Sequence, residues 1–196
     1  MHNDQSNYYS ESNQNHTNNQ SDALNTISTW GEAFGATLAA IGSTPIFFLS
    51  SDFLFNLNLI GETIQIGGIT GQVEAENKVS YNSIGNVIQI GGISWDIGNF
   101  LTFRDQNTSL QFHLRKSFSV QFVGVSVCLT YYLKQPQTLF TLYNIYANVL
   151  QLIGLSIKIL STLPFLSSKK SQTFSTVGNW IQAIGIILMA ISLSVK

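Results

Sequence analysis

Residues 85–92 read Gly-Asn-Val-Ile-Gln-Ile-Gly-Gly, and this stretch decides the fold because its frame recurs along the chain. In each copy a small residue is followed seven positions later by glycine, usually with glutamine three positions before that glycine. The six copies cover residues 35–42, 61–68, 85–92, 117–124, 147–154 and 178–185. Their final glycines are 24 to 32 residues apart, a spacing typical of repeats that each form one supersecondary unit.

The frame predicts a narrow stripe along one face of a helix. On a helix that turns about 100° per residue, its small residue, glutamine and glycine fall within roughly 60° of arc. Glycine inside a helix costs about 1 kcal/mol relative to alanine, and close packing between helices would offset that cost. The glutamine amide could then hydrogen-bond across the contact. The predicted packing stripe consists of Gly61, Gln65, Gly68, Gly85, Gln89, Gly92, Gln151, Gly154, Gly178, Gln182 and Gly185.

Short segments of the repeats leave a strand interpretation open. Residues 64–66 and 88–90 both read Ile-Gln-Ile, and such alternation of apolar and polar residues is typical of strands. The apolar stretches are too long for single strands, however, and the whole frame fits one helix face. We therefore predict helices.

The chain divides into a polar N-terminal segment and six apolar stretches. Residues 1–22 are rich in Asn, Gln and Ser, and we expect this tail to be disordered because it has little apolar surface to bury. Residues 23–196 would form a helical repeat domain. Prolines and charges separate stretches near 24–43, 53–71, 80–101, 112–133, 138–160 and 174–195. Short connections favour antiparallel neighbours, so we predict an all-α, up-and-down array of about six glycine-notched helices.

The composition favours a membrane. Charged residues make up 10% of the chain and hydrophobic residues 44%, whereas soluble domains carry about 25% charged residues. Residues 135–157 and 171–195 carry no charge and exceed the length of about 20 residues that spans a bilayer. The stretches 53–71 and 80–101 contain several polar residues and an acid each, so whether they span stays open. A soluble, cytoplasmic bundle that acts as an interaction module is the alternative.

Two acids in these polar stretches are candidate intramembrane groups. Glu62 and Asp96 would lie within helices, where ionisable residues often mark ion or proton pathways. The structural alternative is that Glu62 only replaces the asparagine that follows the first glycine in other repeats. Glu32 and Lys158 also lie in apolar stretches, Glu32 near a segment start and Lys158 where its long side chain could reach an interface.

The sequence contains no motif of a known catalytic or metal site. It lacks the Gly-x-Ser-x-Gly elbow, the phosphate-binding loop and the His-Glu-x-x-His helix. Cys128 is the one cysteine and lies in an apolar run, so we expect an inert buried thiol. With a net charge of −1 and no basic segment, nucleic acid is not an expected partner. We expect no enzyme, no cofactor and no metal, and no small-molecule ligand can be inferred.

Residues 180–185 read Trp-Ile-Gln-Ala-Ile-Gly, and similar segments occur at 39–45 and 57–61. With these motifs, residues 27–195 resemble a family of repetitive proteins of unknown function from Bacillus and relatives. The resemblance implies a bacterial helical repeat protein without an established activity, and it assigns no functional residue. The chain departs from the pattern at Ala39 and at 117–118.

These observations predict a non-catalytic, membrane-associated helical repeat protein of structural or envelope type, located at the bacterial cell membrane. Its expected partners are the lipid bilayer and, through the stripes, a second copy of the chain. A small transporter or pore component that uses Glu62 and Asp96 is the alternative function.

Overall fold

The computed structural model describes the backbone of residues 4–76, 78–103 and 107–195, with side chains from residue 19 onward except 107 and 108. The described residues form helices and no strand, so the predicted all-α, up-and-down array is confirmed and the strand interpretation of residues 64–66 and 88–90 is wrong. The helices are α1 (Asp4–Gly42), α2 (Ser51–Ala75), α3 (Tyr81–Phe103), α4 (Asn107–Leu133), α5 (Leu139–Ser161) and α6 (Ser168–Ser192), followed by the 3-10 turn η1 (Leu193–Val195).

Local sequence signals set the ends of several helices. Pro45, Pro136 and Pro164 all lie in connections, where the missing amide N–H breaks no helical hydrogen bond. α2 starts after Ser50 and α5 after Thr138, and the hydroxyl of each accepts a hydrogen bond from a backbone N–H three residues later. Such N-caps satisfy one of the free donors at a helix start.

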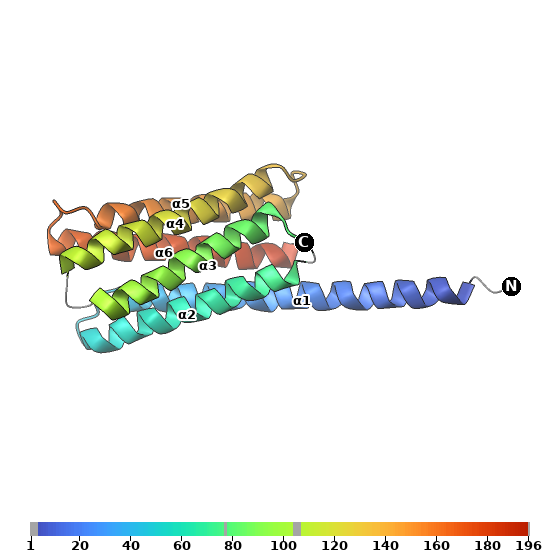
Figure 1. Cartoon of the computed structure of the whole chain (residues 1–196), viewed down its shortest axis with the longest axis horizontal. Helices are drawn as coiled ribbons and strands as arrows, with labels where there is room; N and C mark the ends of the chain where they lie inside the picture. Colours follow the sequence, from blue (N-terminus) through green and yellow to red (C-terminus); the bar gives the residue numbers. More distant parts are fainter. Residues whose placement is uncertain (1–3, 77, 104–106, 196) are drawn as a thin grey trace.

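The six helices form a closed ring. Each helix contacts the next one in the chain, and α6 contacts α1. Figure 1 shows the helices lying side by side along one common direction. The ring is built from three helix hairpins, α1–α2, α3–α4 and α5–α6, whose two helices pack against each other most extensively. Because neighbouring helices run in opposite directions, each end of the ring gathers residues from all six helices.

Within each hairpin the small residues lie opposite one another. A Cβ atom added to Gly35 would lie 2.6 Å from the backbone oxygen of Gly61, and one added to Gly85 would lie 2.6 Å from that of Gly124. In α5–α6 the same distance is 2.6 Å for a Cβ on Gly154 and the oxygen of Gly178. These distances are too short for a real Cβ contact. The seven-residue spacing therefore places backbone directly against backbone in all three hairpins.

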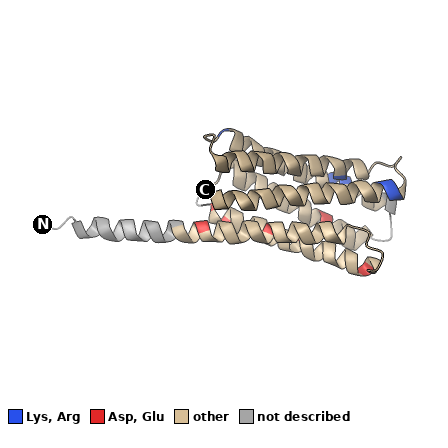
Figure 2. Ribbon diagram, turned by 180° about the vertical axis from the view of Figure 1, so that it is seen from behind, with Lys and Arg blue, Asp and Glu red and all other residues tan. Residues whose placement is uncertain are grey.

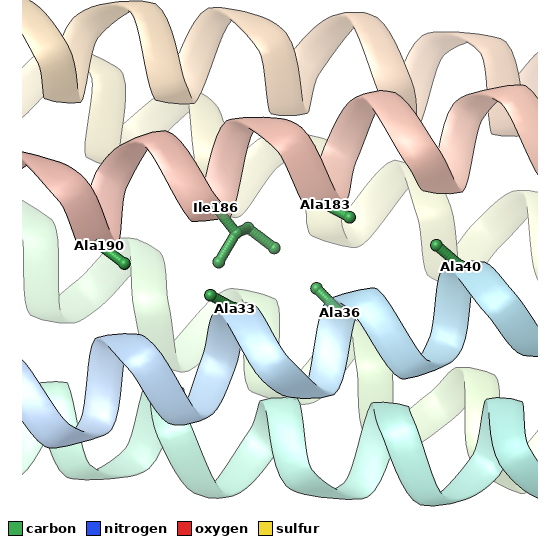
Figure 3. Close-up of a cluster of buried hydrophobic side chains, with 6 residues drawn as sticks. All are labelled: Ala33, Ala36, Ala40, Ala183, Ile186 and Ala190. Atoms are coloured by element: carbon green, nitrogen blue, oxygen red, sulfur yellow. The ribbon is translucent and has the colours of Figure 1, made fainter.

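The ring closes where α1 meets α6. Figure 3 shows Ala33, Ala36 and Ala40 of α1 facing Ala183, Ile186 and Ala190 of α6, and all six side chains are buried. Two hydrogen bonds from α6 to the α1–α2 connection support this contact, from the Thr176 hydroxyl to the Ser43 carbonyl and from the Trp180 indole to the Thr44 hydroxyl.

Compared with most soluble proteins, the chain exposes many large apolar side chains and buries many polar ones, although apolar residues such as Ile69, Leu155 and Ile186 are buried as well. Large apolar residues are exposed on the outside of every helix, among them Phe34, Ile60, Val87, Val123, Ile153 and Ile184. Amides and charged groups are buried on the inside, as described below. Charged residues are few and scattered over the ring (Figure 2).

The disorder expected for residues 1–22 stays a prediction. Helix α1 begins at Asp4 and extends past the other helices (Figure 1), whereas residues 1–3 lie outside the described residues. The Ser21 hydroxyl donates to the Ala75 carbonyl at the end of α2, so tertiary contacts begin before residue 23.

Adjacent glycines in α2 provide a matched test of the close backbone contact. A Cβ on Gly68 would lie 2.6 Å from the Ser28 oxygen, whereas one on Gly67 would meet nothing within 4 Å. We expect Gly68→Ala to lower the free energy of unfolding by about 1–3 kcal/mol through overpacking. Gly67→Ala should raise it by up to about 1 kcal/mol through helix propensity. Unfolding titrations in detergent measure both values, and equal effects of the two substitutions would contradict the packing described here.

Candidate functional site: a polar axis inside the helix ring

The glutamines of the repeats all point into the protein. Every one of them is buried, and so are four asparagines from α3 and α5, the three named next and Asn99. These side chains are Gln65, Gln89, Gln121, Gln151, Gln182, Asn86, Asn144 and Asn148. Buried amides lose favourable free energy unless they are hydrogen-bonded. Their partners therefore decide what this interior can do.

Four cross-helix hydrogen bonds follow one rule. Here the closing glycine is the last residue of each eight-residue frame. The residue three positions before a closing glycine bonds to the residue four positions after the closing glycine of the other helix in the hairpin. We call these the glutamine position and the partner position. The donor–acceptor distances are 2.6 Å for Gln72 Nε2 to Glu32 Oε2, 3.6 Å for Gln89 Nε2 to Cys128 Sγ, 3.3 Å for Gln121 Nε2 to Asp96 Oδ2, and 3.4 Å for Lys158 Nζ to Gln182 Oε1. Glu32 occupies the glutamine position of a further copy of the frame at residues 28–35.

Two glutamines have a partner position that cannot bond to them. Ala39 occupies it for Gln65, and Met189 occupies it for Gln151. Neither side chain offers a hydrogen-bond donor, and Gln151 Oε1 is buried without a partner. The rule therefore also accounts for this unsatisfied amide.

The glutamine positions and Asp96 were predicted from the sequence. Gln72 and Cys128 had no predicted role, and Lys158 was expected to reach an interface. In the structure Lys158 is buried, 5% exposed, with its ammonium 4.3 Å from the centre of the Phe118 ring. The missed signal was present in the chain. Counting four residues beyond Gly35 and beyond the closing glycines at 68, 92, 124, 154 and 185 gives all six partner positions.

Three charged residues gather near the middle of the ring. Glu62, Asp96 and Lys158 come from α2, α3 and α5, and we call them the central triad. Lys158 is close enough to interact electrostatically with both carboxylates. Asp96 is fully buried and accepts a hydrogen bond of 2.8 Å from the Ser117 hydroxyl in addition to the bond from Gln121. The predicted acids Glu62 and Asp96 are therefore brought together, and the positive charge of Lys158 partly balances their two negative charges.

Glu62 differs from Asp96 in its hydrogen bonding. Its side chain is 6% exposed, and its Oε2 atom has no hydrogen-bond partner. Leaving a buried carboxylate oxygen without a donor costs more than leaving a neutral group, because the desolvated charge is not compensated. Glu62 is thus the least satisfied member of the central triad.

A small cavity lies beside Glu62. Residues of all six helices line it, including Glu62, Lys158, Gln121 and Gln182. Its size corresponds to about one water molecule, and its walls carry the several polar groups that a buried water requires. A water there would supply the donor that Glu62 Oε2 lacks.

A larger cavity opens at each end of the ring, again lined by all six helices. At the end where α2 and α4 finish, a cavity of about 320 Å³ is lined by Asp22, Glu76 and several Asn, Ser and Thr side chains; we call it the acidic vestibule. At the opposite end, a cavity of about 460 Å³ is lined by six serines, and we call it the serine-lined vestibule. Gln72, the partner of Glu32, lines the acidic vestibule, whereas Phe118, the neighbour of Lys158, lines the serine-lined vestibule.

The site is built for polar contacts and charge rather than metal binding. Among the described residues, no three His, Cys, Asp or Glu side chains are grouped as they would be around a metal ion. The Cys128 thiol is buried between Gln89 and Asn86, which agrees with the expected buried cysteine. The arrangement instead offers carboxylates, amides and one ammonium along the ring axis.

The sequence model of a family of unknown function (DUF6944) matches residues 23–190, which is most of the chain. This confirms the coarse part of the predicted resemblance, and it brings no activity or residue role with it; the Bacillus origin stays a prediction. No curated protein and no solved structure matches the chain.

The empty partner position at Met189 gives a test of the hydrogen-bonding rule. Met189→Gln keeps the size of the side chain and offers an amide to Gln151, whose Oε1 is unsatisfied. We expect the free energy of unfolding to rise by about 0.5–1.5 kcal/mol, the net value of a hydrogen bond. A double-mutant cycle with Gln151→Met measures the coupling directly. No coupling between the two positions would contradict the rule.

Proposed function

This chain belongs to the DUF6944 family, and we propose that it is a non-catalytic integral membrane protein whose six helices all cross the bilayer. The observation that supports the proposal most is the distribution of side chains, with many large apolar residues outside and many polar ones inside. In water, a ring covered with large apolar residues would expose far more contiguous apolar surface than soluble monomers do. In lipid, the same surface is the one that the surroundings favour.

The helix lengths fit a bilayer. The five helices α2 to α6 have 23 to 27 residues, which at 1.5 Å per residue gives roughly 35–40 Å. A hydrocarbon core of about 30 Å needs about 20 residues. All five helices are therefore long enough to span, and α1 is longer still.

By length and composition, two of them are candidate membrane spans. These are Leu139–Ser161, with a mean hydropathy of 1.2, and the helical segment Ser168–Val195, with 1.6. By itself this is weak evidence, because core helices of soluble proteins can be equally apolar. Three of the polar residues that lower the hydropathy of α2 and α3, Glu62, Gln65 and Asp96, are buried inside the ring. The faces that would meet lipid on these helices carry residues such as Ile60, Ile84 and Val87.

The packing stripes bear on the proposed homo-oligomer. Their glycines contact partner helices of the same chain, so these faces are occupied within one molecule. Self-association would therefore use the outer apolar surface, where Gly67, Gly91 and Gly98 have open space beside them. Small residues on a lipid-facing surface allow helices of two copies to approach closely. A structural or envelope role through such contacts is part of the proposal.

A charge placed on the outer surface distinguishes a membrane protein from a soluble bundle. Ile184 lies in the middle of α6 and is 51% exposed. In a bilayer, Ile184→Lys should cost about 2.5–3.5 kcal/mol on insertion scales, and less protein should remain in the membrane pellet after an alkaline carbonate wash. In a soluble bundle, a surface substitution changes stability by only about 0.5 kcal/mol.

Phe47→Lys provides the matched control, because Phe47 is 98% exposed in the α1–α2 connection, outside every helix. This variant should stay in the pellet like the wild type. Recovery of the wild-type protein in the soluble fraction would contradict the proposed membrane location and favour the soluble interaction module.

A further inference from the structure

We propose that the central triad relays protons between the two vestibules, so that the ring is a proton-conducting path across the membrane. This inference rests on the proposed membrane function and names the transported species. It is carried by the juxtaposition of two acids, one lysine and a water-sized cavity between vestibules at both ends of the same axis.

The size of the central cavity selects the species. A cavity for about one water molecule cannot hold a hydrated metal ion, and the Lys158 ammonium beside it repels cations that pass through intact. A proton needs no such space, because it moves by exchange between hydrogen-bonded oxygens. The Glu62 Oε2 atom, which has no protein partner, is available to a water in the cavity.

The charges of the triad balance when it holds one additional proton. Two carboxylates and one ammonium carry a net charge of −1, and a buried net charge is unfavourable in a low dielectric. In the proposed relay, a hydronium ion of the acidic vestibule gives its proton to Glu32 and leaves as water, and an intervening water passes a proton on to a Glu62 oxygen. The proton then leaves Glu62 through the cavity water for Asp96, which is hydrogen-bonded to Gln121 of the cavity wall but does not itself line the cavity. Opening of the barrier at Phe118 lets a water of the serine-lined vestibule finally accept the proton from Asp96. One O–H bond forms and one breaks in each transfer.

Groups on both sides of the triad connect it to the vestibules. On the acidic side, Glu32 is buried and hydrogen-bonded to Gln72, which lines the acidic vestibule. Glu32 of α1 lies beside Gly68 of α2, and Glu62 of α2 lies close to Ala39 of α1. Glu32 and Glu62 are therefore separated by roughly 10 Å along the axis. This distance requires an intervening water in addition to the two carboxyls. The acidic lining of that vestibule would concentrate protons at its mouth.

Phe118 closes the other side. Its ring is 3% exposed, lines the serine-lined vestibule, and lies against the Lys158 ammonium at 4.3 Å. Five of the six repeats have a small or polar residue at the equivalent place after the first small residue; this repeat has phenylalanine. The phenyl ring of Phe118 therefore separates the central triad from water in the serine-lined vestibule, and its removal should open the path.

The test uses the full chain reconstituted in phosphatidylcholine vesicles that contain a pH-sensitive dye, with a potassium gradient and valinomycin to set the membrane potential. We expect proton influx well above that of empty vesicles. Glu62→Gln and Asp96→Asn should each lower it by about 100-fold, the smaller end of what a positioned proton-transfer group contributes. Glu74→Gln is the matched control, because Glu74 is an exposed carboxylate on the same helix as Glu62, and its flux should equal that of the wild type.

Phe118→Ala tests the path without relying on loss of function. This variant should conduct protons several-fold faster than the wild type, and adding Glu62→Gln should remove the gain. Wild-type and Phe118→Ala vesicles that leak no faster than empty ones would overturn the inference. Equal flux in the wild type and Glu62→Gln would do the same, as would potassium flux equal to proton flux when valinomycin is omitted. If the protein stays in the membrane pellet after a carbonate wash but conducts no protons, the proton relay is refuted and the proposed membrane location still stands.

Discussion

The close backbone contact within each hairpin is the constraint on which the rest of the structure depends. Glycine, alanine or serine every seven residues lets two antiparallel helices approach until only backbone lies between them, as at Gly35 and Gly61. Such an approach leaves no room for large side chains at the contact. The long side chains of each helix must therefore point outward or toward the ring axis. Three hairpins built in this way close into a ring because α1 and α6 also meet through small residues.

This constraint explains why the interior is polar. A stripe only 60° wide cannot bury the apolar surface of a helix, so Ile, Leu, Val and Phe cover the outside. The axis is then left to the glutamine and partner positions, which face each other across each hairpin. Their hydrogen bonds engage the buried amides of Gln72, Gln89, Gln121 and Gln182, and such bonds strengthen in a medium without competing water. A bilayer around the ring would remove that competition on all sides.

The sequence predicted the architecture well because the repeat fixes both the helix face and the spacing. Residues 85–92 alone indicate which side chains lie on the packing face, and Pro45, Pro136 and Pro164 indicate where helices end. The contact of Ser21 with the end of α2 was not predicted, since composition does not reveal a single tertiary hydrogen bond. The central triad was predicted in part. Glu62 and Asp96 stood out as acids in apolar stretches, but the place of Lys158 depends on the register of α5 against α6, which a single helix does not reveal.

The partner positions show how one structural frame comes to carry different chemistry. The same place, four residues after a repeat glycine, holds Gln72, Asp96, Cys128 and Lys158 in four helices, and alanine or methionine in the other two. The glutamine that faces it is nearly constant, and an amide can donate to a carboxylate, accept from an ammonium or bond to another amide. The constant glutamine thus allows the partner position to vary without loss of the fold. Each charged residue of the interior belongs to a different repeat, so a few substitutions are enough to set the net charge on the axis.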